Sequence, residues 1–240
     1  MDDLSRRMWL LTSAALFAGL AARRGARAEP QSQDERAVAD FDSVLWDATG
    51  ELLITQSSRE RLTIEAEPSV IAKVVAEVTQ RRLHIGFRPG SVQTQQPIRF
   101  LLEVKNLCAL ETRGSGAVHI GALATNALLL RLAGSEWIEM VQLRARTLDV
   151  RLDGAGGLAI AAGEVERQKV VIAGAANYRA AALASRQADV AIDGSGEVRL
   201  AVSERLGVRI AGSGAVIYRG NPQVLPTVSG AGEIRREDDR

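Results

Sequence analysis

The sequence predicts an all-β fold, a parallel β-helix with turns of roughly 18–20 residues and a cap of β-strands at its N-terminal end. Three observations favour this fold class. A glycine-containing word recurs seven times between Gly114 and Ile234, its spacing is nearly constant, and apolar residues alternate on both sides of it. A short period repeated this often is typical of solenoids, in which each repeat packs on its neighbours. Turns of this length hold two short strands and leave no room for a pair of helices.

The interval between the first glycines of successive words is constant from Gly114 to Gly194 and becomes shorter, again constant, from Gly194 to Gly230. Most words carry a second glycine two positions later, with a small residue between. Glycine suits a tight corner because it has no Cβ and adopts positive φ readily. The predicted structural turn glycines are Gly114, Gly116, Gly134, Gly154, Gly156, Gly174, Gly194, Gly196, Gly212, Gly214, Gly230 and Gly232.

Positions at fixed offsets from the first glycine of each word predict which side chains face the interior. The residue four places after it is apolar in every word, and the residues four and two places before it are mostly valine, isoleucine or leucine. The residues between them are mixed and often charged, so we expect them to face solvent. Seven such turns stacked at ~4.8 Å would form a rod on the order of 30 Å long with an aliphatic core.

Residues 1–28 have the pattern of an export signal. Arg6 and Arg7 precede a short apolar run, and residues 26–28 read Ala-Arg-Ala, so we expect cleavage after Ala28. Residues 5–10 also resemble the twin-arginine export consensus. The apolar run is short for a membrane span, and a retained N-terminal anchor is the alternative. We therefore expect an exported protein, located in the periplasm, on the outer surface or in the medium.

The remaining chain is expected to form one domain, residues 38–236. Residues 29–37 are polar and lack periodicity, which predicts a flexible leader. Residues 38–107 alternate without the strict glycine period and are expected to form the entry turns and cap. Within them, residues 70–80 could form a helix capped by Ser69, but their valines favour a strand. Residues 108–236 form the glycine-ladder repeats, which Pro226 and the charged tail, residues 237–240, prevent from stacking further.

The motifs resemble those of a known family. Residues 106–110 read Asn-Leu-Cys-Ala-Leu, and the word Gly-Ser-Gly-Ala-Val at 114–118 returns in similar form at 194–198 and 212–216. This order resembles the putative auto-transporter adhesin head GIN domain, a bacterial family of exported proteins of unknown biochemical function. The resemblance covers residues 38–236 and implies a right-handed β-helical domain with an adhesin-like role. Lys105 departs from the family pattern, where proline is usual, and the third and fifth repeats begin with aspartate where serine is common.

Composition argues against several functions. The net charge is +1 and residues 1–28 carry +3, so the rest of the chain carries −2, with arginines and acids interspersed. This pattern excludes an electrostatic nucleic-acid binder. Cys108 is the single cysteine, so no internal disulfide can form, and its column predicts a buried side chain. Ser115, Ser195 and Ser213 lie between glycines but lack the strand-to-helix context of a nucleophile elbow, and no phosphate-binding or other cofactor motif is present.

The ionisable residues give little sign of chemistry. His84 and His119 have no cysteine partners, and no loop gathers the oxygen ligands of a calcium site, so no metal site is predicted. Asp153 and Asp193 share a column two turns apart, roughly 10 Å by strand spacing. That separation is just beyond the ~6.5–9.5 Å of an inverting glycosidase, and aspartate before glycine is better explained by turn hydrogen bonding.

The other outward charges are also expected to be structural. Glu136, Glu197 and Glu233 are predicted on the solvent face of a corner, and the stacked Arg131 and Arg151 could meet an anionic glycan but are better explained as solubilising residues.

We therefore predict a non-enzymatic, exported protein of adhesin-head type with a binding or structural role, and with no catalytic, cofactor or metal residues. A carbohydrate-active β-helix enzyme is the first alternative, and an envelope-stress or signalling accessory protein is the second. A glycan, an envelope or surface protein, and a second copy of the chain are the partner classes that the sequence leaves open.

Overall fold

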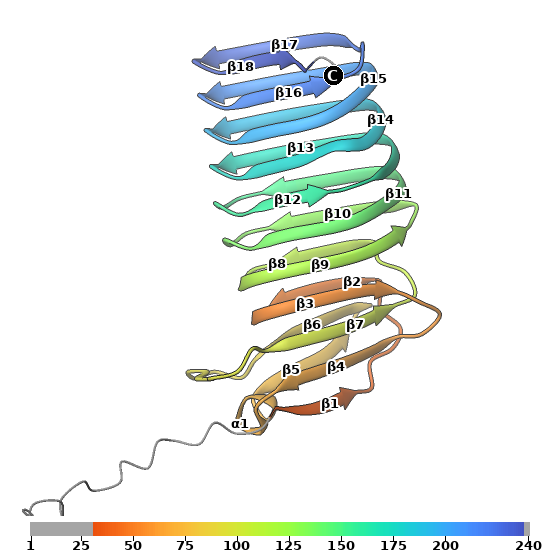
Figure 1. Ribbon diagram of the computed structural model, residues 1–240, viewed down its shortest axis with the longest axis vertical. Helices are drawn as coiled ribbons and strands as arrows, with labels where there is room; N and C mark the ends of the chain where they lie inside the picture. Colours follow the sequence, from red (N-terminus) through yellow and green to blue (C-terminus); the bar gives the residue numbers. More distant parts are fainter. Residues whose placement is uncertain (1–30, 238–240) are drawn as a thin grey trace, which may run out of the picture.

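The computed structural model describes residues 31–237 as a β-solenoid of about 6 turns, which confirms the predicted fold class. Tight corners align on the left of Figure 1 and wider bends on the right. The N-terminal part contains β1 (Ser32–Arg36), β2 (Ser43–Asp47), β3 (Thr49–Gln56), β4 (Arg61–Ala66), α1 (Pro68–Ile71), β5 (Val74–Thr79), β6 (Arg82–Phe87) and β7 (Arg99–Val104). The glycine-rich part contains β8 (Ala109–Thr112), β9 (Ser115–Ala124), β10 (Ala127–Leu132), β11 (Trp137–Leu152), β12 (Gly157–Ile160), β13 (Gly163–Gly174), β14 (Asn177–Gly194), β15 (Glu197–Gly212), β16 (Ala215–Arg219), β17 (Gln223–Gly230) and β18 (Glu233–Arg236).

Each turn contains a front strand and a back strand. The front strand follows a glycine corner, as in residues 137–142, and the back strand precedes the next corner, as in residues 147–152; β11 contains both, joined by a bend. Equal positions of successive turns pair in parallel, for example Leu128 with Leu148 on the back strands and Ile138 with Leu158 on the front strands. Parallel pairing in constant register therefore turns the sequence period into columns of side chains along the axis.

The predicted interior columns form the core. The front-strand column is fully buried at Val118, Ile138, Leu158, Tyr178, Val198 and Val216. The column two residues before each corner is equally buried from Thr112 to Ile210. In the last described turn the same column is open, since Val228 is 44% exposed and no further described turn covers it.

The first turn of the chain is not at the end of the stack. Strand β2 pairs with β6 on one side and β8 on the other, and β3 lies in the same way between β7 and β9. All these pairings are parallel, so the orange strands in Figure 1 lie between yellow and green ones. The chain therefore leaves its first turn, builds the cap, adds β6 and β7 beneath that turn, and crosses over to begin the glycine ladder above it.

The cap is antiparallel. Strand β4 pairs with β7, and β1 pairs with β4 over residues Ser32–Arg36. The predicted flexible leader is therefore wrong for these residues. Strand β1 is polar on both faces, so it has no apolar alternation, and it is held by the backbone ladder and by polar contacts such as Gln33 Nε2 to Glu65 Oε1 at 2.6 Å. Phe41, which follows it, is buried in the core.

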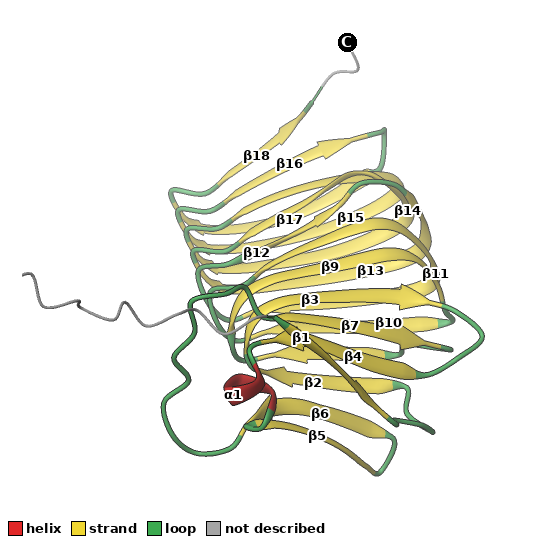
Figure 2. Cartoon of the chain, turned by 60° about the horizontal axis from the view of Figure 1, so that its bottom comes forward, coloured by secondary structure: helices red, strands yellow, loops and turns green. Residues whose placement is uncertain are grey.

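The ambiguous segment 70–80 is mostly a strand, and the alternative of one helix capped by Ser69 is wrong. Strand β5 covers Val74–Thr79 and pairs antiparallel with β6, which confirms the preference for a strand over most of the segment. The short helix α1 precedes it, begins with Pro68 after Glu67 at the N-cap, and lies beside the cap strands in Figure 2. Proline fits the first turn of a helix because its missing N–H would have no helical partner there.

Two predicted segments fall at the termini. The predicted export signal, with cleavage after Ala28, and residues 238–240 of the predicted tail lie outside the described residues. Within residues 31–237, no helix is long and apolar enough to cross a membrane.

Candidate functional site

The predicted turn glycines lie at the corners between back and front strands. Gly194 has a φ of +138°, which favours glycine, and a Cβ there would be 2.2 Å from the carbonyl oxygen of Gly174. At Gly154 the reason is contact alone, because a Cβ would be 1.9 Å from the carbonyl oxygen of Gly134. Successive corners therefore stack backbone on backbone.

The paired aspartates do not form a carboxylate pair with a shared target. Asp193 stands beside Ala173 of the neighbouring turn, and Asp153 stands one further turn away. Both Asp153 carboxylate oxygens accept from Arg151 Nε at 2.8 Å. Asp153 is therefore engaged by a side-chain ion pair, and the predicted hydrogen bonding from these aspartates to the turn backbone stays a prediction.

The glutamates of the corners have two different environments. Glu197 and Glu233 share a front-strand column with Ala215 between them, and both face outward as predicted. Glu136 does not: its side chain is completely buried, and neither carboxylate oxygen makes a hydrogen bond of standard geometry. The prediction of a solvent-facing Glu136 is therefore wrong. Its position holds glycine or alanine in the other words, and here the carboxyl group fills the space beside the Cβ-less Gly134.

The histidines and the cysteine lie apart from one another. His119 faces outward between Glu51 and Glu139, with nitrogen–oxygen distances of 3.5 and 3.4 Å, and His84 lies on β6. Within residues 31–237, no three His, Cys, Asp or Glu side chains gather as metal ligands would. Cys108 is half-buried rather than buried, and its Sγ lies 3.1 Å from Asn106 Nδ2 in the loop before β8. The loop tilts this residue out of the column that Leu128 and Leu148 occupy in the interior.

The serines and arginines singled out in the sequence have structural contacts. Ser115 Oγ lies 3.2 Å from Thr49 Oγ1 on the adjacent strand, and Ser195 and Ser213 lie at corners where their amides bond the preceding turn. Arg131 and Arg151 pair in register on the exposed back face, as predicted.

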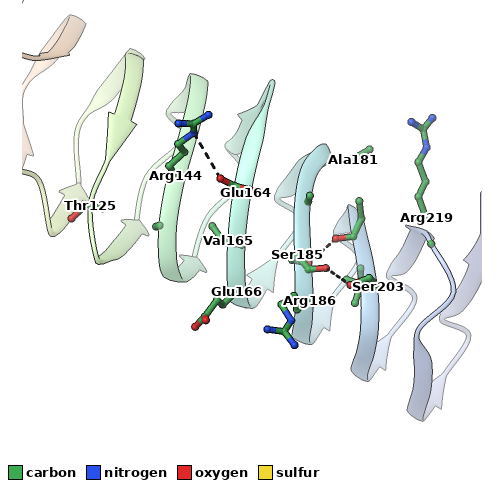
Figure 3. Close-up of a pocket in the computed structure, with 15 residues that line it drawn as sticks. Thr125, Arg144, Glu164, Val165, Glu166, Ala181, Ser185, Arg186, Ser203 and Arg219 are labelled. Carbon is green, nitrogen blue, oxygen red and sulfur yellow. Dashed lines mark hydrogen bonds and ion pairs between the residues drawn. The ribbon is translucent and has the colours of Figure 1, made fainter.

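A long groove lies on the opposite edge, where the chain bends from front to back strands (Figure 3). It encloses about 810 Å³ and takes residues from six successive turns, beginning at Thr125 and ending at Gly220. Five steps of ~4.8 Å make it about 24 Å long, parallel to the solenoid axis. Its floor consists of small or aliphatic side chains, including Ala145, Val165, Ala184 and Ala201. The groove therefore has the form of a channel for an extended molecule.

A buried polar network lies under the floor. Tyr178 OH donates to Gln168 Oε1 at 2.8 Å, Gln168 Nε2 donates to Ser185 Oγ at 2.7 Å, and Ser185 Oγ donates to the Ala201 carbonyl at 2.6 Å. Burial raises the pKa of Tyr178, so the phenol stays protonated and donates. Because the members of this chain are linked end to end by hydrogen bonds, the network holds the floor rigid.

The network marks the point where the turns become shorter, between β14 and β15. In the pairing of these strands, Ala180 faces Leu200 while Ala184 faces Ala201, so residues 181–183 have no partner in β15, although Leu183 pairs with Gly163 of β13. The extra residues of β14 widen the bend on the groove side. Ser185 Oγ donates a hydrogen bond to the Ala201 carbonyl at this irregular step. Without this bond the strand ladder would be weaker here.

Charges of both signs lie at the rim: Arg144, Glu164, Glu166, Arg186 and Arg219 line the groove, and Glu204 and Glu237 lie beside lining arginines. Arg144 lies 3.9 Å from Glu164, Arg186 lies 2.7 Å from Glu204, and Arg219 lies 2.9 Å from Glu237. All six side chains reach solvent. The rim therefore offers guanidinium donors and carboxylate acceptors in alternation along the groove.

The sequence did not reveal this groove. Its lining includes residues between the interior columns, such as Ala181 and Ala184, whose only signal in the sequence is a run of small side chains. The run is visible in the sequence, but its concave shape follows from the bend and the shortened turn.

The comparisons with known proteins agree with the fold. The family model described as "Putative auto-transporter adhesin, head GIN domain" matches residues 40–222. The chain belongs to this family. Lys105 and the aspartates that begin two repeats therefore lie within the range of variation that the family accepts.

Solved structures show the same fold at low sequence identity. A putative adhesin from Bacteroides fragilis aligns with a TM-score of 0.82 at 20% identity, over 88% of this chain and 98% of that chain. A putative adhesin from Parabacteroides distasonis gives 0.70 at 19%, over 87% and 98%. A putative lipid binding protein from the same organism gives 0.69 at 22%, over 87% and 97%. No curated protein matches the chain.

Proposed function

We propose that this chain is an exported, non-enzymatic binding protein of the adhesin-head type, and that it binds an extended glycan along the groove of Figure 3. The groove carries the proposal. Its length of about 24 Å, its open form and its direction along the axis suit a linear polymer better than a compact metabolite. Membership of an adhesin-type family supports the same interpretation.

The chemistry of the groove favours a hydroxyl-rich polymer over a peptide strand. An extended peptide usually binds a sheet edge through backbone hydrogen bonds, but the groove crosses the strands, whose backbone groups are used in the parallel ladder. Sugar hydroxyls both donate and accept, and they match the alternating guanidinium and carboxylate groups of the rim. The small floor residues leave room for the rings.

The proposal includes a lack of catalytic activity. Glu164 and Glu204 lie beside Arg144 and Arg186, and Asp153, one of the two aspartates considered for catalysis, is held by Arg151 at a corner away from the groove. A glycosidase needs one protonated and one ionised carboxyl group at the scissile bond. Carboxylates that lie beside a guanidinium group suit binding better than proton donation.

A glycan-array screen of the purified protein, followed by a reducing-sugar assay on each ligand found, tests this function. We expect binding without release of reducing ends. Ala184→Trp fills the exposed groove floor and is expected to weaken binding at least tenfold, whereas Leu129→Trp, an equally bulky change at an exposed position of the back strand, is expected to leave it unchanged. Release of reducing ends that stops in Asp153→Asn or Asp193→Asn would favour the enzyme instead.

A further inference from the structure

Trp137 lies at the start of β11 on the outward face of the front strands. Its neighbours in the same column are Ala117 and Gly157, so no large side chain stands on either side of it. The ring lies over the backbone of Gly157, because a Cβ built there would be 2.1 Å from ring atom Cζ3. The side chain is half-buried. The outward face thus carries an indole ring that rests on bare backbone and is fixed in place by it.

Arg179 is held against this ring without a carboxylate partner. Its guanidinium carbon lies 5.2 Å from the ring centroid, within the range of a cation–π contact. Among residues 31–237, no acid lies within ion-pair distance of Arg179. The next arginine of the column, Arg199, differs: its Nε donates to Glu197 at 2.7 Å. Arg179 therefore presents a positioned cation whose charge the described residues leave uncompensated.

Neighbouring polar groups complete the surface. Asn177 stands one turn beyond Gly157 in the column of Trp137, and within the described residues its amide makes no side-chain hydrogen bond. The nearby acids are engaged elsewhere, Glu139 with His119 and Glu197 with Arg199. The free hydrogen-bonding groups beside the ring are thus a guanidinium group and an amide, a donor-rich set suited to an oxygen-rich anion.

We propose that Trp137, Asn177 and Arg179 form a subsite for an acidic saccharide unit, whose ring packs on the indole and whose carboxylate pairs with Arg179. A pyranose ring has an apolar C–H face that packs on aromatic rings, and a carboxylate pairs with guanidinium through strong charge-assisted hydrogen bonds. The subsite adjoins the groove: Arg179 precedes Ala181 by two residues on the same face of β14, and Ala181 lines the groove wall. The inference rests on the proposed glycan-binding function and names the ligand class.

The test pairs acidic oligosaccharides with neutral ones. The purified protein is titrated with oligogalacturonate, an oligoglucuronate and a sialylated trisaccharide, each against its uncharged counterpart, and followed by calorimetry and tryptophan emission. We expect at least one acidic ligand to bind at least tenfold more tightly than its counterpart, to change the emission, and to weaken as salt rises. Trp46 is buried, so a change that disappears in Trp137→Phe is assigned to Trp137.

Matched variants separate the subsite from the groove. Arg179→Gln and Trp137→Ala are expected to weaken acidic ligands at least tenfold, while Arg199→Gln, which removes a paired arginine of the same column, changes little; thermal unfolding verifies that each variant folds. Glycan binding that is lost in Ala184→Trp but kept in Trp137→Ala and Arg179→Gln overturns this inference and leaves the proposed function intact. Equal affinity for neutral counterparts also overturns it. If no glycan binds at all, both proposals fail.

Discussion

The carboxyl group of Glu136 lies inside the solenoid, beside the corner at Gly134 and near the Thr112 hydroxyl. Removal from water raises the pKa of Glu136 above its ordinary value of 4.5, and nearby backbone and hydroxyl donors offset this only in part. Folding therefore favours the neutral form of this acid more than the unfolded chain does. In the unfolded chain the same group ionises near 4.5.

The consequence for stability has a definite sign. The preference of the folded state for neutral Glu136 contributes fully to the free energy of unfolding below pH 4.5, and this contribution is lost as pH rises through the raised pKa. Glu136 therefore stabilises the folded state in acid more than at neutral pH. We predict that Glu136→Gln, which keeps the shape and removes the charge, is more stable than the wild type at pH 7 and that the difference shrinks toward pH 4. Urea midpoints measured across this range test it.

An exposed acid provides the control for Glu136. Glu164→Gln changes an exposed carboxylate on the groove rim, and its difference from the wild type should be small and should not follow the same curve. Other carboxylates, such as Glu111, whose pKa is lowered by nearby arginines, titrate in both proteins and cancel in the comparison. Parallel pH curves for Glu136→Gln and the wild type would contradict a buried, neutral Glu136.

At the scale of the elements, the glycine corners set how closely the turns can stack. Gly154 has no room for a Cβ, since the atom would lie 1.9 Å from a backbone oxygen that is fixed in the ladder. We predict that Gly154→Ala lowers the free energy of unfolding by roughly 1–3 kcal/mol or more, through overpacking that only a backbone shift can relieve. Chemical unfolding followed by circular dichroism measures the loss.

A second glycine on a neighbouring front strand gives the matched control for Gly154. A Cβ on Gly121 would have Ile54 O as its nearest neighbour at 3.7 Å, an ordinary contact, and its φ is not in the positive region. Gly121→Ala should therefore be neutral or slightly stabilising, because alanine loses less backbone entropy than glycine on folding. Equal losses for the two variants would mean that composition, rather than corner geometry, decides the stability.

The same elements explain what the sequence could and could not predict. The interior columns were predictable, because parallel pairing repeats one alternation at a fixed period, and Val118 to Val216 follow it. The insertion of β2 and β3 between later strands was not, because any parallel neighbour satisfies the same alternation. Strand β1 was missed for a related reason: a polar edge strand buries no face and so leaves no periodic trace.

The candidate site was harder to predict than the fold. The groove depends on the curvature of the bend and on the register change after Ala180, which are properties of two turns together rather than of either alone. Trp137 was visible as an aromatic residue in an outward column, but its contact with Arg179 joins residues two turns apart. The Glu136 side chain points into the interior rather than to solvent because Gly134, which has no Cβ, leaves space for its carboxyl group. That space is visible only in the packed structure.

At the scale of the whole molecule, the two ends of the solenoid differ. The N-terminal end is covered by the antiparallel cap, whereas the last described turn, β17 and β18, presents an open edge. Open edges pair readily with other chains, and natural proteins use proline and charge against this. The backbone amides of Ala231, Glu233 and Glu237 donate to carbonyl groups of the preceding turn. In this last turn the N–H groups of odd-numbered residues therefore point to the preceding turn, and those of even-numbered residues point to the open end of the solenoid.

Pro226 occupies one of the positions whose N–H would point to the open end. The register of β17 on β15 is continuous from Gln223 to Gly230, so the same alternation of N–H directions holds at Pro226, in the middle of the strand. Proline has no N–H, so a hydrogen-bond donor is missing from the open edge at this position. We predict that Pro226→Val restores this donor and makes the protein associate end to end as concentration rises, as seen by sedimentation velocity. Thr227→Val adds an apolar residue to the same strand without a new outward donor, and it should behave as the wild type does. Association of both variants to the same extent would assign the effect to hydrophobicity, and association of neither would mean that the charged side chains of β18 protect the edge without the proline.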